Sequence, residues 1–223
     1  MRHDVQATFW DALDVAPDQY SKVRDMRVDR ASKRDVDEFC RRWHYSSRGG
    51  SAAWNYGVWD GHTLAGVASY NLPTMDACAA VFGPERWEWV AHLGRLVCAE
   101  DAPRNIESKL IARSLRLLKI DRPVVRAVLT FAAPSAGHLG YVYQATNALY
   151  LGKSMGRSYF VDQHGARRSD SHSSHTIARS RGWEVVKEVG KHRYLYLVGS
   201  RSERKEARRL LKHDVLAYPK SVD

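Results

Sequence analysis

Hydrophobic residues recur at helical spacing over residues 32–43, and Ser32 is suited to cap that helix. Residues 54–59 and 63–70 have the composition of strands. Asp60-Gly61 lies between them and is a strong hairpin signal. The first half of the chain therefore predicts a helix followed by an antiparallel meander, after a short amphipathic segment at residues 5–20.

A strand, a helix and a second strand are predicted next, at residues 87–97, 105–118 and 124–131. Asn105 is expected to cap this helix, and the apolar run VVRAVLTF is typical of a buried strand. Further strands are predicted at residues 158–161 and 193–198, before a basic helix at residues 202–213.

This order of elements predicts an α+β fold with a central mixed, mostly antiparallel sheet and helices on both faces. We expect residues 1–223 to form one domain. The order resembles that of the GNAT acyltransferases, in which the fourth strand splays from the fifth and coenzyme A lies in the gap. In such a fold the turn at residues 99–105 would receive the pyrophosphate of the cofactor.

Charge is concentrated near the C-terminus. The chain has 35 Lys and Arg against 25 Asp and Glu, and from Gly165 onward the count is 14 against 7. The basic part at residues 164–223 favours a polyanion such as double-stranded DNA, although a solvated basic tail would give the same count. The three cysteines lack CxxC spacing, and no run approaches the roughly 20 apolar residues of a membrane span. A soluble, cytoplasmic protein is expected.

Residues 137–147, GHLGYVYQATN, hold two glycines, an imidazole, two phenols and two carboxamides. A packed helix or strand would carry aliphatic side chains at a fixed period instead. The glycines let a ligand approach the backbone, and the other side chains transfer protons or form hydrogen bonds. This segment is therefore the first candidate for a functional site.

Motifs spread over residues 40–220 resemble the Mom family of bacteriophage DNA modification proteins. They are His44-Tyr45, the hairpin at 61–70, Leu93-Gly94-Arg95-Leu96, the turn at 103–108, the segment 137–147, Tyr150, Gly152 and Tyr218-Pro219-Lys220. The resemblance implies a GNAT-like enzyme that converts adenine in DNA to its N6-carbamoylmethyl form and protects phage DNA from restriction. Two features depart from the pattern: Ala133 replaces an acidic residue, and the glycine-rich pyrophosphate loop of GNAT acetyltransferases is missing.

Modification of adenine N6 needs a base, because the exocyclic amine becomes nucleophilic only as its proton leaves. Tyr143, His138 and His44 are the candidates for proton transfer. The alternative is structural: Tyr143 would be a half-buried aromatic with a bonded hydroxyl, and His138 would satisfy a helix end.

Substrate or cofactor contacts are predicted for Arg95, Asn105, Ser108, Gln144, Asn147, Tyr45 and Tyr70. A carboxamide can pair bidentately with adenine, although Gln144 and Asn147 are equally suited to cross-link backbone. Asn105 and Ser108 either cap their helix or receive a phosphate there. Arg95 is either an anion contact or an ion-pair partner. Alternation places Trp54 and Tyr56 on one side of their strand and Asn55 on the other.

The segment at residues 164–183 is expected to be a surface loop that contacts DNA phosphates through Arg167, Arg168, Arg179 and Arg181. Its histidines offer a less favoured metal site, and iron or another metal bound through His44 and His138 stays open. Acetyl-CoA or another acyl-CoA is implied by the fold resemblance. Simple acetyl transfer would not give the family's product, so the sequence leaves the donor undefined.

Two rival functions remain at this point. The first is a GNAT N-acyltransferase that acts on an amine of a small molecule or protein. The second is a DNA-binding relative without catalysis, which the alanine at position 133 and the basic C-terminal part would explain.

Overall fold

The computed structural model describes residues 22–43, 53–134, 137–168, 178 and 180–220. The amphipathic segment predicted at residues 5–20 lies outside the described residues, and so do His44, Tyr45 and Arg179.

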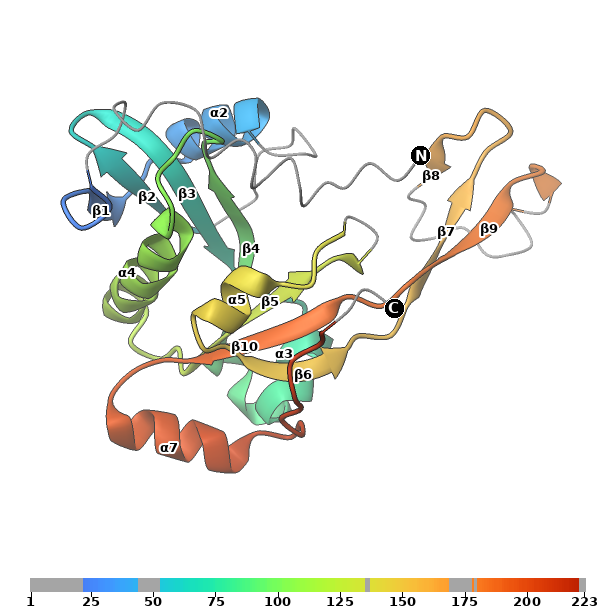
Figure 1. The fold of residues 1–223 in the computed structure, drawn as a ribbon. Coiled ribbons are helices and arrows are strands. Elements are labelled where there is room, and N and C mark those ends of the chain that lie inside the picture. Colours follow the sequence, from blue (N-terminus) through green and yellow to red (C-terminus); the bar gives the residue numbers. More distant parts are fainter. Residues whose placement is uncertain (1–21, 44–52, 135–136, 169–177, 179, 221–223) are drawn as a thin grey trace.

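Seven strands form the main sheet in the order β1-β2-β3-β4-β5-β10-β6 (Figure 1). Their bounds are Arg27–Arg30 for β1, Trp54–Asp60 for β2, Thr63–Asn71 for β3, Val90–Cys98 for β4, Ala127–Ala132 for β5, Leu149–Lys153 for β6 and His192–Leu197 for β10. Neighbouring strands are antiparallel except β4 and β5, which run parallel. Helix α4 (Ile106–Asp121) supplies the crossover that a parallel pair requires. The predicted α+β, GNAT-like architecture is confirmed.

Helices cover both faces of this sheet. On one face α4 and the short α5 (Tyr141–Ala145) pack on a core that includes Tyr56, Tyr70 and Val128. On the opposite face α2 (Lys33–Trp43) and α3 (Met75–Phe82) cover two separate apolar clusters. Tyr56 and Trp54 both contact the α4 core, which confirms the face that alternation predicts for them.

The parallel pair separates after three residues. Val90, Ala91 and His92 pair with Ala127, Val128 and Leu129, and none of the later residues of the two strands pair. The Thr130 hydroxyl donates to the Leu93 carbonyl at 3.2 Å, just where the ladder ends. Beyond this contact the strands splay, as the fold prediction required.

A three-stranded sheet is inserted between β6 and β10. It has the order β8-β7-β9, with bounds Arg157–Val161 for β7, Arg167–Arg168 for β8 and Glu184–Glu188 for β9. Figure 1 shows it extending away from the seven-stranded sheet. The strand predicted at residues 158–161 is β7. Strand β8 lies within the surface loop predicted at residues 164–183, and β9 begins directly after it.

Side-chain caps were predicted at the starts of two helices, and the structure contains one of them. The Asp35 N–H donates to Ser32 Oγ at 3.1 Å, so Ser32 caps α2 as predicted. Asn105 does not cap α4 in this way: it is left-handed (φ 67°) and its side chain makes no capping hydrogen bond. The prediction of an Asn105 side-chain cap was therefore wrong, because a cap of this type needs extended backbone at that residue.

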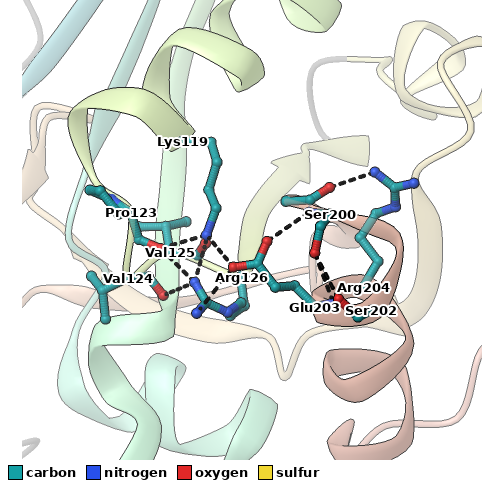
Figure 2. A network of polar contacts seen from close by, with 10 residues as sticks. Lys119, Pro123, Val124, Val125, Arg126, Ser200, Ser202, Glu203 and Arg204 are labelled. Carbon is teal, nitrogen blue, oxygen red and sulfur yellow. Dashed lines mark hydrogen bonds and ion pairs between the residues drawn. The ribbon is translucent and has the colours of Figure 1, made fainter.

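Helix α7 (Arg201–Leu210) is joined to the rest of the fold through Glu203 (Figure 2). Its carboxylate closes a capping box with Ser200 and also pairs with Lys119 at 3.0 Å and Arg126 at 3.2 Å. Lys119 is in α4 and Arg126 precedes β5, so one carboxylate links three elements. The helix η2 (Pro84–Trp89) delays the start of β4 to Val90, three residues later than predicted.

Candidate active site at the splayed strands

The polar segment after β5 turns into α5, and Gly140 (φ 79°) starts that helix. A side chain at Gly140 would come within 2.6 Å of the Tyr194 ring, so the glycine also allows close packing. Gln144 donates to the Leu139 carbonyl at 3.3 Å and to Tyr194 Oη at 3.0 Å. The carboxamide of Gln144 therefore cross-links α5 to β10, which is the structural alternative for this residue.

Tyr143 belongs to a group of phenols beneath α5. Its ring lies 5.5 Å from that of Tyr194. Tyr70, Tyr194 and Tyr196 are buried, whereas Tyr143 is partly exposed. Of these four phenols, Tyr143 is thus the one that a ligand can reach.

Burial holds the three inner phenols in their protonated form. Desolvation raises the pKa of Tyr194 to about 12, against an opposing hydrogen bond from Gln144. It also raises the pKa of Tyr70 and Tyr196. Tyr70 bonds to Ser114 Oγ at 2.6 Å and is fully buried, so it offers no surface to a ligand in this arrangement.

The other predicted residues of this segment lie on the surface. His138 precedes α5 and is exposed, and Asn147 follows it and is also exposed. Asn147 is left-handed, with φ 62°. The structure thus places Tyr143 and Gln144 on α5. His138 comes before this helix in the sequence, and Asn147 comes after it.

Arg95 lies on the opposite face of the sheet. Its Nη1 donates to the Gly94 carbonyl at 2.8 Å, and the ion pairs formed among the described residues do not include it. Its strand neighbour is Ser69, and the neighbour of Ser69 on the next strand is Asn55. The ion-pair alternative for Arg95 finds no support in this part of the chain.

His92, which the sequence interpretation did not single out, lies on the same face as Arg95. Its Nδ1 is 3.0 Å from Asn71 Oδ1, and its ring meets that of Phe131 at 5.6 Å. Burial, with smaller effects from the charges of Arg95 and Lys191, lowers the pKa of His92 to about 4. It is therefore a neutral imidazole at neutral pH. Because it comes from the middle of a strand, no local motif marks it.

The start of α4 could receive an anionic group. Asn105 is exposed, Ser108 is half-buried in the first turn, and the Asn105 side chain makes no capping hydrogen bond to the helix N-terminus. Glu107 lies between them, and burial raises the pKa of its carboxyl.

The predicted DNA contacts are partly described. Arg167 and Arg168 form β8 and pair with Val161 and Phe160. Arg181 is exposed, with its guanidinium 5.0 Å from the Trp183 ring. In the described ranges, no three His, Cys, Asp or Glu residues gather to hold a metal, and no helix has the length and apolarity to cross a membrane. The proposed His44 and His138 pair is untested because His44 lies outside these ranges.

A family model described as the Mom protein family matches residues 25–220. The chain belongs to the Mom family. Among the relatives of this Mom protein is the methylcarbamoylase Mom of Escherichia phage Mu, which is 26% identical over 208 residues, covering 88% of this chain and 85% of the phage Mu protein.

Solved structures similar to this chain include acetyltransferases. The ribosomal-protein-S18-alanine N-acetyltransferase of Escherichia coli is 10% identical, covers 78% of this chain and 95% of its own, and has a TM-score of 0.46. A putative acetyltransferase of Salmonella typhimurium, solved with acetyl-CoA, is 9% identical, covers 79% and 95%, and has a TM-score of 0.48.

Proposed function

We propose that this protein is a transferase that modifies adenine in DNA, placing a carbamoylmethyl group on N6. Membership of the Mom family carries the proposal, and the phage Mu relative is named a methylcarbamoylase. The formal charge of +10 is compatible with a DNA substrate. In this proposal the modification protects phage DNA from restriction in the bacterial cytoplasm.

Tyr143 is the residue that we propose for proton transfer. It is partly exposed, whereas the phenols packed behind it are buried and stay protonated, so it is the phenol of its group that we assign to relay a proton. His138 and His44 remain the alternative bases. Ala133 replaces the family's acidic residue, so in this protein the proton transfer takes place without that carboxylate.

An acyl-CoA is the cofactor that the topology favours. The separation of β4 from β5 after His92 and the absence of a side-chain cap at the start of α4 support this proposal, in which Asn105 and Ser108 would hold the pyrophosphate. When bound it would supply an activated acyl group, which by itself gives an N-acyl product and not the CH2-linked amide, so the donor of the carbamoylmethyl group stays undefined. This cofactor also supports the second candidate function, an N-acyltransferase for a small-molecule or protein amine, which would turn over acetyl-CoA without DNA.

The proposed function predicts a new adenine species in cells that express the protein. DNA digested to nucleosides and examined by mass spectrometry should contain it with the wild type, and Tyr143→Phe should lower it by roughly 10²-fold or more. The fold should persist, because the ring contact with Tyr194 is kept.

Tyr141→Phe is the matched control, since it removes an exposed phenol from the same helix. It should leave the yield unchanged. If DNA from cells that contain soluble wild-type protein yields only unmodified nucleosides, the modification function is refuted. If Tyr143→Phe is fully active, the role of Tyr143 is refuted. Duplex binding with no altered nucleoside would favour the inactive relative.

A further inference from the structure

The motif Tyr218-Pro219-Lys220 has no role in the function proposed above, yet the structure brings it to the segment that carries Tyr143. Tyr218 belongs to the C-terminal segment, residues 211–220, which follows α7 and passes β6 (Figure 1). Its hydroxyl donates to the Ala148 carbonyl at 2.9 Å, and its ring lies 6.5 Å from that of Tyr194. Ala148 comes shortly after α5, so Tyr218 bonds to the chain next to the candidate active site.

Two other motif residues hold the C-terminal segment in this place. The Leu216 N–H donates to the Tyr150 carbonyl at 2.9 Å, so the segment bridges to the edge strand β6. Gly152 leaves room for Leu216, because a Cβ at this glycine would lie 3.2 Å from Leu216 Cδ1. Motif residues that stand apart in the sequence therefore meet at one place, beside residues 139–148.

Among the described residues, three phenols donate hydrogen bonds into residues 139–148. For Tyr196 the direction follows from Thr146, whose hydroxyl gives its own proton to the Val142 carbonyl at 2.6 Å. The Thr146 oxygen is therefore free to accept from Tyr196, which lies 2.6 Å away. The three bonds are those of Tyr194 to the Leu139 carbonyl, Tyr196 to Thr146 Oγ1 and Tyr218 to the Ala148 carbonyl. They fix the start and the end of this segment, with α5 between them.

The backbone of Tyr143 is tied to the same segment. Its N–H donates to the Gly140 carbonyl at 2.9 Å, and its carbonyl accepts from the Ala148 N–H at 2.9 Å. Ala148 is fully buried. It bonds to Tyr143 through its N–H and to Tyr218 through its carbonyl, so two hydrogen bonds lead from the C-terminal segment to the residue proposed for proton transfer.

Helix α5 depends on such contacts for its position. It has five residues, whereas an isolated helix needs about 12 or more to be even marginally stable in water, and none of the five is buried. Tyr194 and Tyr196 reach the segment from β10 and belong to the core. Tyr218 is 39% exposed, so its hydroxyl can be removed without opening that core.

We propose that Tyr218 is a positioning residue for the modification reaction. Its hydroxyl holds the carbonyl of Ala148, and Ala148 in turn holds Tyr143 in the orientation that proton transfer needs. This inference rests on the proposed function, in which Tyr143 relays the proton from adenine N6. Displacement of a reacting group by about 1 Å can cost about 10²-fold in rate, so one peripheral hydrogen bond is able to control the reaction.

The test compares wild type with Tyr218→Phe, which keeps the ring next to Tyr194 and removes the donor to Ala148. The rate at which modified adenine appears in cellular DNA, per amount of soluble protein, should fall about tenfold. Hydrogen exchange of the Ala148 N–H, followed by NMR, should become about fivefold faster, because its peptide loses a hydrogen bond. The melting temperature should stay close to that of wild type, since the lost bond comes from a partly exposed side chain.

Three further variants separate positioning from stability. Replacement of Tyr218 by 4-aminophenylalanine restores an N–H donor at the same place and should recover most of the lost rate. Tyr141→Phe removes another exposed phenol and should leave the rate and the exchange unchanged. Glu203→Gln lowers stability through its bonds to Lys119 and Arg126 rather than to residues 139–148, and it should keep the wild-type rate per soluble protein.

The outcomes distinguish this inference from the proposed function. If wild type forms modified adenine and Tyr218→Phe exchanges and modifies equally well, the positioning role is refuted while the function stands. The same holds if the rate of Tyr218→Phe falls only in step with its melting temperature, as a purely structural role predicts. If wild type forms no modified adenine, the function is refuted and the role of Tyr218 in it falls as well. Faster exchange, a lower rate and recovery with 4-aminophenylalanine together support the positioning role.

Discussion

Burial decides the protonation state of individual residues on both faces of the splayed strands. On one face it keeps the phenols behind Tyr143 protonated, because a phenolate would lose its hydration. On the other face it keeps His92 neutral. The residues that surround the proposed reaction are therefore mostly uncharged, and Arg95 supplies the local positive charge.

His92 should make folding sensitive to mildly acidic pH. Its folded pKa of about 4 lies below the ordinary value of 6.5, so protonation favours the unfolded chain. This contribution to stability is complete above about pH 6.5 and is lost as pH falls toward 4. His92→Gln keeps a group that can bond to Asn71 but does not titrate. Its free energy of unfolding, measured in urea, should therefore fall less than that of wild type between pH 7 and pH 4.5.

His164→Gln is the control for this measurement, since it removes an exposed histidine from the small sheet region. It should reproduce the wild-type decline. An identical decline in His92→Gln would show that the ring titrates without affecting folding.

At the scale of elements, Glu203 fixes α7 against α4 and β5. The capping box satisfies two backbone N–H groups at the start of the helix. The Ser200 N–H donates to the Glu203 carboxylate, and the Glu203 N–H donates to Ser200 Oγ. The hydrogen bond from Ser200, followed by that from Lys119, lowers the pKa of Glu203 to about 2. The helix therefore depends on one ionised side chain at its first turn.

Glu203→Gln should destabilise the protein by about 1–2 kcal/mol at neutral pH, because it weakens the cap and removes the charge partner of Lys119 and Arg126. The pKa of this acid is lowered by folding, so the difference should be constant above about pH 4.5 and shrink as pH falls toward 2. Urea unfolding over this range measures it. Glu206→Gln, exposed on the same helix, should have little effect. A difference that does not change with pH would contradict the ionic explanation.

At the scale of the whole molecule, positive charge is concentrated in the C-terminal quarter. This part includes β8 in the small sheet and α7, where Arg201, Arg204, Lys205, Arg208 and Arg209 are exposed. We propose that the basic part at residues 164–223 contacts DNA phosphates, with Arg167, Arg168, Arg179 and Arg181 as the predicted contacts.

Replacing Arg167 and Arg168 with alanine should weaken duplex binding and lower the slope of log affinity against log salt by about 2, since each lost phosphate contact removes about 0.9. Fluorescence anisotropy over a salt series measures the slope. The double control Arg113→Ala and Arg116→Ala removes the same charge from exposed positions on α4. Equal slopes for the two double variants would mean that net charge alone governs binding.

Several elements were predictable because their signals are local. Ser32 caps α2 through a residue three positions on, and the hairpin between β2 and β3 follows from Asp60-Gly61. Helix α3 was missed because it is buried and apolar with little periodicity, and β6 was missed because it is a five-residue strand. Asn105 failed as a predicted side-chain cap because the turn sets its backbone to a left-handed conformation.

The sequence by itself determined the class of fold, the family, the faces of the meander and the concentration of polar groups at residues 137–147, since these depend on residue type and short-range spacing. Only the tertiary structure decided which distant residues become neighbours. Alternation places Asn55 away from Tyr56, but strand register alone brings Asn55, Ser69 and Arg95 into one row. Register and burial depend on how the whole chain packs, and so this row of polar residues and the neutral His92 appear only in the folded protein.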